Sequence, residues 1–154
     1  MPDAAVRKTV TVDASPARAF EVFTGEMSRW WPLETHHVGA QPATEAVEPR
    51  AGGRWFERAE DGQQCDWGRV LAWDPPDRIV LTFEMSPEWK HDPAYPTEVE
   101  VRFVPEGEGA TRVELEHRRL DVYGEKSAEM AEAFSGDGGW TGILGAYAAV
   151  AIPA

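Results

Sequence analysis

The spacing of apolar and polar residues changes twice along the 154-residue chain. Residues 6–12 alternate between apolar and polar side chains, which predicts a first strand. Ser15-Pro16 then supplies a helix N-cap with proline at the first helical position, and residues 19–23 provide an apolar helix face. A second short helix or turn carrying Trp30 and Trp31 is expected to follow. The chain therefore opens with one strand and two short helices.

From residue 45 to residue 118 the apolar period is two, which is typical of strands. Strong turn signals separate the runs, among them Asp61-Gly62 and Gly107-Glu108-Gly109. Because the connections are short, we expect consecutive strands to pair antiparallel. Ser86–Pro96, which holds three prolines, is interpreted as a mobile rim. The predicted strands are Glu45–Glu48, Arg54–Glu60, Asp66–Trp73, Arg78–Met85, Glu98–Val104 and Ala110–Arg118.

Two of these strands alternate without interruption. Val99, Val101 and Phe103 are expected to face one way, and the charged residues between them the other. Val113 and Leu115 repeat this pattern on the last strand. The sheet should have one dry face and one wet face that carries opposed charges.

After residue 124 the pattern becomes helical again. Glu125–Phe134 is expected to form one helical piece, interrupted by the glycine-rich segment 135–139. Apolar residues then recur at helical spacing from Trp140 to Val150. This order predicts an α+β single domain over residues 1–154, in which a curved antiparallel sheet grips the last helix.

Aromatic content points to the interior of that sheet. Six of the seven tryptophans precede residue 90, and Trp140 lies on the last apolar helix. Large flat side chains either pack as core or line a concave space, and both interpretations stay open here.

The net charge of −12 argues against nucleic acid and anionic membrane surfaces as partners, because both require a basic face. No segment is long and apolar enough to span a bilayer. Cys65 is the only cysteine, so no internal disulfide forms. We expect a cytoplasmic protein without a cofactor.

Two glycine-rich segments lack the sequence of a nucleotide-binding loop. Pro49–Phe56 misses the lysine of a phosphate loop, and 136–142 follows a helix where a dinucleotide fingerprint follows a strand. We interpret the first as a bend and the second as a helix break. His36, His37 and His91 are interpreted as loop residues, so no metal site is expected.

His117 is the most informative titratable residue. It has the parity of Val113 and Leu115, which directs it to the dry side. One interpretation is a core histidine bonded to a carbonyl or acid; the other is a polar anchor or proton-transfer group in the pocket. Glu84, in an otherwise apolar run, is a candidate partner.

The ordered set of motifs resembles the bacterial branch of the heat-shock-protein-90 ATPase activator homologues, within the START and birch-pollen-allergen-like superfamily. The motifs are Ser15-Pro16, Trp30-Trp31-Pro32, Pro49–Phe56, Trp67–Ile79, Gly109–Val113 and Gly139-Trp140. The resemblance implies a helix-grip fold: a seven-stranded curved antiparallel sheet around a long C-terminal helix, with two short N-terminal helices and a hydrophobic cavity between them. Superfamily members bind lipids, hormones or polyketides, and some are cyclases.

We therefore expect a module that binds a small hydrophobic molecule between the sheet and the C-terminal helix. The parity of Trp67 is left open. A cyclase, dehydratase or hydrolase using His117 is the alternative, and a homodimer and a chaperone contact are further candidate partnerships. The expected ligand-binding residues are Trp31, Phe56, Trp67, Phe83, His117, Trp140 and Leu144.

Overall fold

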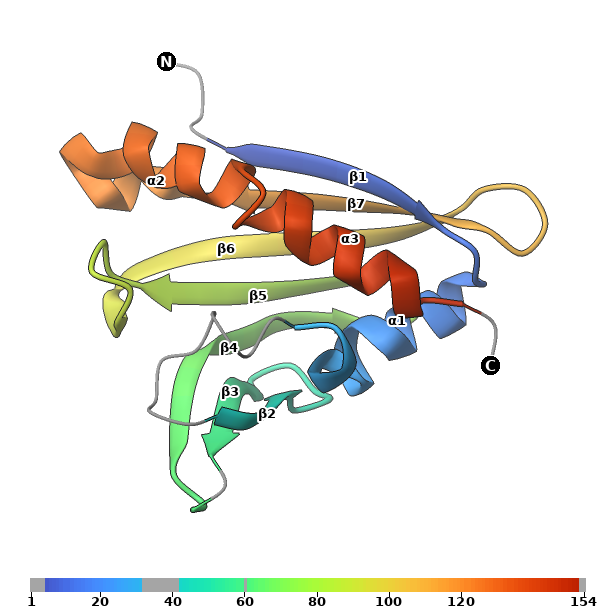
Figure 1. Ribbon diagram of the computed structural model, residues 1–154, viewed down its shortest axis with the longest axis horizontal. Helices are drawn as coiled ribbons and strands as arrows, with labels where there is room; N and C mark the ends of the chain where they lie inside the picture. The colour runs from blue at the N-terminus through green and yellow to red at the C-terminus, as the bar shows by residue number, and fades with distance from the viewer. Residues whose placement is uncertain (1–4, 32–41, 60, 153–154) are drawn as a thin grey trace.

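The computed structural model describes residues 5–31, 42–59 and 61–152. Seven strands form one antiparallel sheet in the order β1-β7-β6-β5-β4-β3-β2. This confirms the predicted seven-stranded architecture (Figure 1). The strands are β1 (Val6–Val12), β2 (Pro42–Val47), β3 (Arg54–Ala59), β4 (Gln64–Asp74), β5 (Arg78–Met85), β6 (His91–Pro105) and β7 (Thr111–Arg118).

Helices cover one face of this sheet. Figure 1 shows α2 and α3 running across the sheet, with α1 at one end. The arrangement is the helix-grip fold of the α+β class. The helical elements are α1 (Pro16–Gly25), the 3₁₀ helix η1 (Met27–Arg29), the 3₁₀ helix η2 (Leu120–Lys126), α2 (Ser127–Ser135) and α3 (Trp140–Val150).

The start of α1 follows the sequence signal. Ser15 Oγ accepts the backbone N–H of Arg18 at 3.2 Å, and Pro16 occupies the first helical position. Phe20 and Phe23 on its buried face both make edge contacts with Phe103 of β6. This packing fixes α1, and with it η1, against the inner face of the sheet.

The wet and dry faces predicted for β6 and β7 are confirmed. Val99 pairs with His117, and Val101 with Leu115, on the buried side. On the outer side Glu100 accepts from Arg78 Nε at 2.5 Å and from Arg118 Nη1 at 2.6 Å. The dry face is thereby directed toward the helices.

The prediction that Ser86–Pro96 forms a mobile rim is wrong for the second half of that segment. β6 begins at His91, so only residues 86–90 form the turn between β5 and β6. Tyr95 stacks on Tyr123 with ring centroids 5.4 Å apart, and His91 Nε2 lies 3.0 Å from Glu84 Oε1. These contacts hold a proline-containing strand in place.

The C-terminal helix is divided, as the glycine-rich segment predicted. α2 ends at Ser135 and α3 begins at Trp140. The helical region begins earlier than expected, with the 3₁₀ turns of η2 from Leu120, and Gly124 marks a kink with φ of 57°. The break lets Trp140 enter the interior at the first residue of α3.

The segment Pro49–Phe56 contains a bend, as predicted. Gly52 has φ of +83°, in the left-handed region that favours glycine. Its N–H donates to the carbonyl of Val70, and the Val70 N–H donates to the carbonyl of Gly53. The bend thus attaches the start of β3 to β4.

Candidate functional site

Four tryptophans from four parts of the chain meet on the inner side of the sheet. Trp31, just after η1, makes edge contacts with Trp55 of β3 and Trp67 of β4, at centroid distances of 5.6 and 5.2 Å. Trp140 of α3 lies 6.1 Å from Trp31. All four are buried. We call Trp31, Trp55, Trp67 and Trp140 the tryptophan cluster.

Phe83 of β5 extends the cluster toward α2. Its ring lies 5.6 Å from Trp55, 5.7 Å from Trp67 and 5.5 Å from Phe134 of α2. Aromatic rings therefore run continuously from η1 across the sheet to the C-terminal helices. These rings are buried and pack against one another in the core.

His117 of β7 is held on both ring nitrogens by protein groups. The Trp140 Nε1–H donates to its Nδ1 at 3.0 Å, and its Nε2 lies 2.8 Å from Thr97 Oγ1. Since Nδ1 accepts, we assign the proton to Nε2, which donates to Thr97; Thr97 in turn donates to the carbonyl of Phe83 at 2.6 Å. Complete burial lowers the pKa of His117 to about 3. The neutral imidazole therefore positions Trp140.

Glu84, the suggested partner of His117, lies elsewhere. Its carboxylate accepts from Thr82 Oγ1 at 2.6 Å, and its other oxygen meets His91. Glu84 has the opposite parity on β5 to the inward-facing Phe83, which places it on the outer side of the sheet.

The structure brings together most of the residues expected to bind a ligand. Phe56 is the exception: it stays outside the buried cluster, and the Arg54 guanidinium lies 4.4 Å from its ring centroid. Trp55 occupies the inner position, because alternation on β3 directs residues 55 and 57 inward. The residues that share the buried core are Trp31, Trp67, Phe83, His117, Trp140 and Leu144.

Sequence reasoning missed two buried acids beside the tryptophan cluster. Glu45 of β2 and Glu57 of β3 are direct cross-strand partners and are only 3% and 2% exposed. The Trp67 Nε1–H donates to Glu57 Oε1 at 2.9 Å. The alternation along β3 places Glu57 on the same side of the strand as Trp55. Nothing in the sequence showed which side of this strand faced inward, so the burial of Glu57 could not be predicted.

The environment of Glu45 favours its neutral form. Burial, with a contribution from the nearby Glu57, raises the pKa of Glu45 to about 9. The Trp55 N–H offsets part of this increase, although no hydrogen bond of normal geometry joins the two. Glu45 is therefore a buried carboxylic acid at neutral pH.

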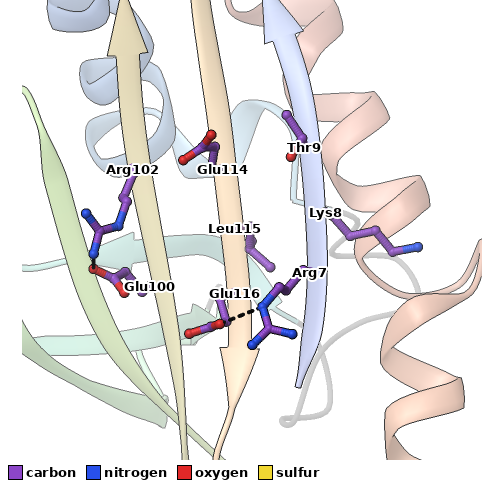
Figure 2. A pocket seen from close by; sticks show the side chains of 8 residues that line it. All are labelled: Arg7, Lys8, Thr9, Glu100, Arg102, Glu114, Leu115 and Glu116. Atoms are coloured by element: carbon purple, nitrogen blue, oxygen red, sulfur yellow. Dashed lines mark hydrogen bonds and ion pairs between the residues drawn. The ribbon is translucent and has the colours of Figure 1, made fainter. Parts of the chain in front are cut away.

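The surface pockets formed by the described residues include two that lie away from the tryptophan cluster. One, of about 350 Å³, lies over β1, β7 and β6 on the charged face. Figure 2 shows its charges paired with one another, Arg7 with Glu116 and Arg102 with Glu100. The other, of about 570 Å³, is lined by Arg54, Gln64, Cys65, Asp66, Lys90 and His91.

The described part of the chain shows neither a metal cluster nor a membrane span. Within residues 5–31, 42–59 and 61–152, no three His, Cys, Asp or Glu side chains gather as metal ligands. Over the same ranges no helix has the length and apolar character needed to cross a bilayer. His36 and His37 lie outside the described residues.

The fold and its aromatic interior define a helix-grip protein of the START-like superfamily. The chain belongs to the family described as Activator of Hsp90 ATPase homolog 1-like protein, which matches residues 13–150. None of the curated proteins compared with the chain matches it.

Three solved structures similar to this chain differ in their sequence identity to it. An anthrahydroquino-gamma-pyrone synthase, complexed with SUM, is 40% identical, with 97% of this chain and 99% of that chain covered and a TM-score of 0.66. A self-sacrificing resistance protein, CalC from Micromonospora echinospora, is 31% identical, covering 97% and 94%, with a TM-score of 0.65. A protein from Nitrosomonas europaea is 13% identical, covering 94% and 92%, with a TM-score of 0.64, and shows the shared fold alone.

Proposed function

We propose that this protein binds a planar, polycyclic aromatic molecule against the tryptophan cluster. The observation that carries the proposal is the meeting of four buried indoles beside buried polar atoms that have no partner among the described residues. Indole faces and edges supply apolar contact to fused rings, and the polar atoms supply orientation. The residues proposed to contact the ligand are Trp31, Trp55, Trp67, Phe83, Trp140 and Leu144. His117 is proposed to position Trp140.

A second candidate function is ring closure on such a molecule. It is favoured by the 40% identity to the anthrahydroquino-gamma-pyrone synthase, which extends over almost the full length of both chains. On this proposal the protein converts an aryl 1,3-diketone with an ortho-phenol into a fused pyrone with loss of water. Enzymes of this kind need an acid and a base held beside the bound substrate.

A chaperone contact is not proposed. The described large apolar side chains that are clearly exposed are Leu71 on β4, Trp89 in the β5–β6 turn and Ile152 after α3. These three side chains come from three separate elements.

Titration with alizarin, a dihydroxyanthraquinone, tests the binding proposal. We expect saturable quenching of tryptophan fluorescence and a rise in melting temperature that grows with alizarin concentration. Trp31→Phe should weaken binding about tenfold, because Trp31 contacts the other three members of the cluster.

Trp89→Phe is the matched control, since Trp89 is half exposed and outside the cluster. It should leave the affinity for alizarin unchanged. Equal affinities for the Trp31 and Trp89 variants, or a melting temperature that does not respond to alizarin, would contradict binding at the cluster.

A further inference from the structure

The two buried acids are fixed in position by the backbone around them. Glu45 and Glu57 stand opposite each other in the β2–β3 register, so their side chains share the inner face. Ser28 of η1 clamps the Glu45 backbone: the Glu45 N–H donates to Ser28 Oγ at 2.8 Å, and Ser28 Oγ donates to the Glu45 carbonyl at 3.0 Å. The strand that carries Glu45 is therefore tied to the helix that precedes Trp31.

The two carboxyl groups have different surroundings. Glu57 Oε1 accepts the indole N–H of Trp67 at 2.9 Å. Neither carboxyl oxygen of Glu45 has a hydrogen-bond partner among the described residues, and neither does the buried Trp55 Nε1. Leaving a buried polar atom unsatisfied is energetically costly. The Glu45 carboxyl and the Trp55 N–H interact without a hydrogen bond of normal geometry, so both retain hydrogen-bonding capacity for a ligand that carries oxygen atoms.

The asymmetry gives the two carboxyl groups different roles. Glu45 holds its proton at neutral pH because its pKa is about 9, so it can donate. Glu57, already oriented by Trp67, can accept. Two carboxyl groups whose environments differ in this way are suited to act as acid and base on one substrate.

We propose that Glu45 and Glu57 are the acid and the base of a ring closure on the ligand bound at the tryptophan cluster. The proposal rests on the proposed function. It gives catalytic roles to two residues of β2 and β3 and assigns the substrate to aryl 1,3-diketones with an ortho-hydroxyl group.

The step balances without an oxidant or reductant. The phenol oxygen forms a bond to the distal carbonyl carbon, its proton passes to Glu57, and the Glu45 proton passes to the carbonyl oxygen. In the second half the carbon–hydroxyl bond breaks with the Glu57 proton transferred to the leaving hydroxyl, which departs as water. Glu45 then takes the proton from the adjacent carbon, a carbon–carbon double bond forms, and both groups return to their starting states.

The test measures closure of ortho-hydroxybenzoylacetone to methylchromone by absorbance, with alizarin binding measured in parallel. The wild type should accelerate closure, and Glu45→Gln and Glu57→Gln should each reduce the rate on the order of 100-fold. Alizarin affinity should stay within about threefold in both variants, because the indoles of the tryptophan cluster are unchanged.

The expected pH dependence and the control variants distinguish a loss of catalysis from a loss of folded protein. The wild-type rate should fall as the pH rises past about 9, where Glu45 loses its proton. Glu45→Gln should fold at least as stably as the wild type, since it removes a buried acid that ionises on unfolding. Glu114→Gln, on the outer face beside Arg112, should leave the rate unchanged.

The possible outcomes distinguish failure of the acid–base pair from failure of the proposed binding function. A wild type that binds alizarin but does not accelerate closure overturns the acid–base pair, as do Gln variants that keep the wild-type rate. A wild type that does not bind alizarin overturns the proposed function itself.

Discussion

At the residue scale, the structure separates what alternation can predict from what it cannot. The parity of residues 113, 115 and 117 placed His117 inside, and the buried imidazole confirms it. Its partners could not be predicted, because Trp140 and Thr97 come from other elements. Phe56 lies outside the buried cluster for a related reason: adjacent aromatics at 55 and 56 gave no indication of which faced inward.

His117 makes the stability of the fold sensitive to acid. Its pKa is about 3 when folded, against about 6.5 in the unfolded chain. Between these values the unfolded chain binds more protons, so the free energy of unfolding decreases as the pH falls below about 6.5. From pH 7 to pH 4.5 this residue should account for a loss on the order of 2–3 kcal/mol.

Urea denaturation of the wild type and His117→Gln at both pH values measures that loss. Glutamine keeps hydrogen-bonding groups but does not titrate, so the variant should lose less stability on acidification. Identical losses in the two proteins would show that His117 is not the neutral core residue described here.

At the element scale, the break between α2 and α3 controls how Trp140 enters the interior. The sequence predicted the break from its glycines, but not how closely the chain passes itself there. A Cβ at Gly142 would lie 2.0 Å from the carbonyl oxygen of Asp137, and one at Gly139 would lie 2.3 Å from that of Phe134. The first turn of α3 therefore packs directly on the preceding segment.

Gly142→Ala and Gly145→Ala form a matched pair on α3. Gly142→Ala should destabilise the protein by about 2 kcal/mol or more, because backbone must move to admit the methyl group. Gly145 has open space around it, so alanine there should raise stability by up to about 1 kcal/mol through helix propensity. Thermal unfolding of both variants checks this, and effects of the same sign would contradict the packing described for the break.

At the scale of the whole molecule, charge and apolar surface are separated across one sheet. The outer face carries cross-strand ion pairs such as those of Glu100, and the inner face carries the aromatic core. Period-two alternation predicted this division, and the short turns predicted the consecutive antiparallel pairing from β2 to β7. The pairing of β1 with β7 joins the two ends of the chain's strand order and did not follow from either signal. Alternation did not predict the buried acids, since charged residues in a strand are ordinarily assigned to the wet face.

The most direct measurement of the central claim is a crystal structure of the protein with alizarin bound. The account predicts fused rings in contact with Trp31 and at least one further indole of the tryptophan cluster, with a ligand oxygen within hydrogen-bond distance of Glu45. Alizarin bound only on the outer surface, or an interior in which Glu45 is contacted by protein groups alone at saturating ligand, would contradict it.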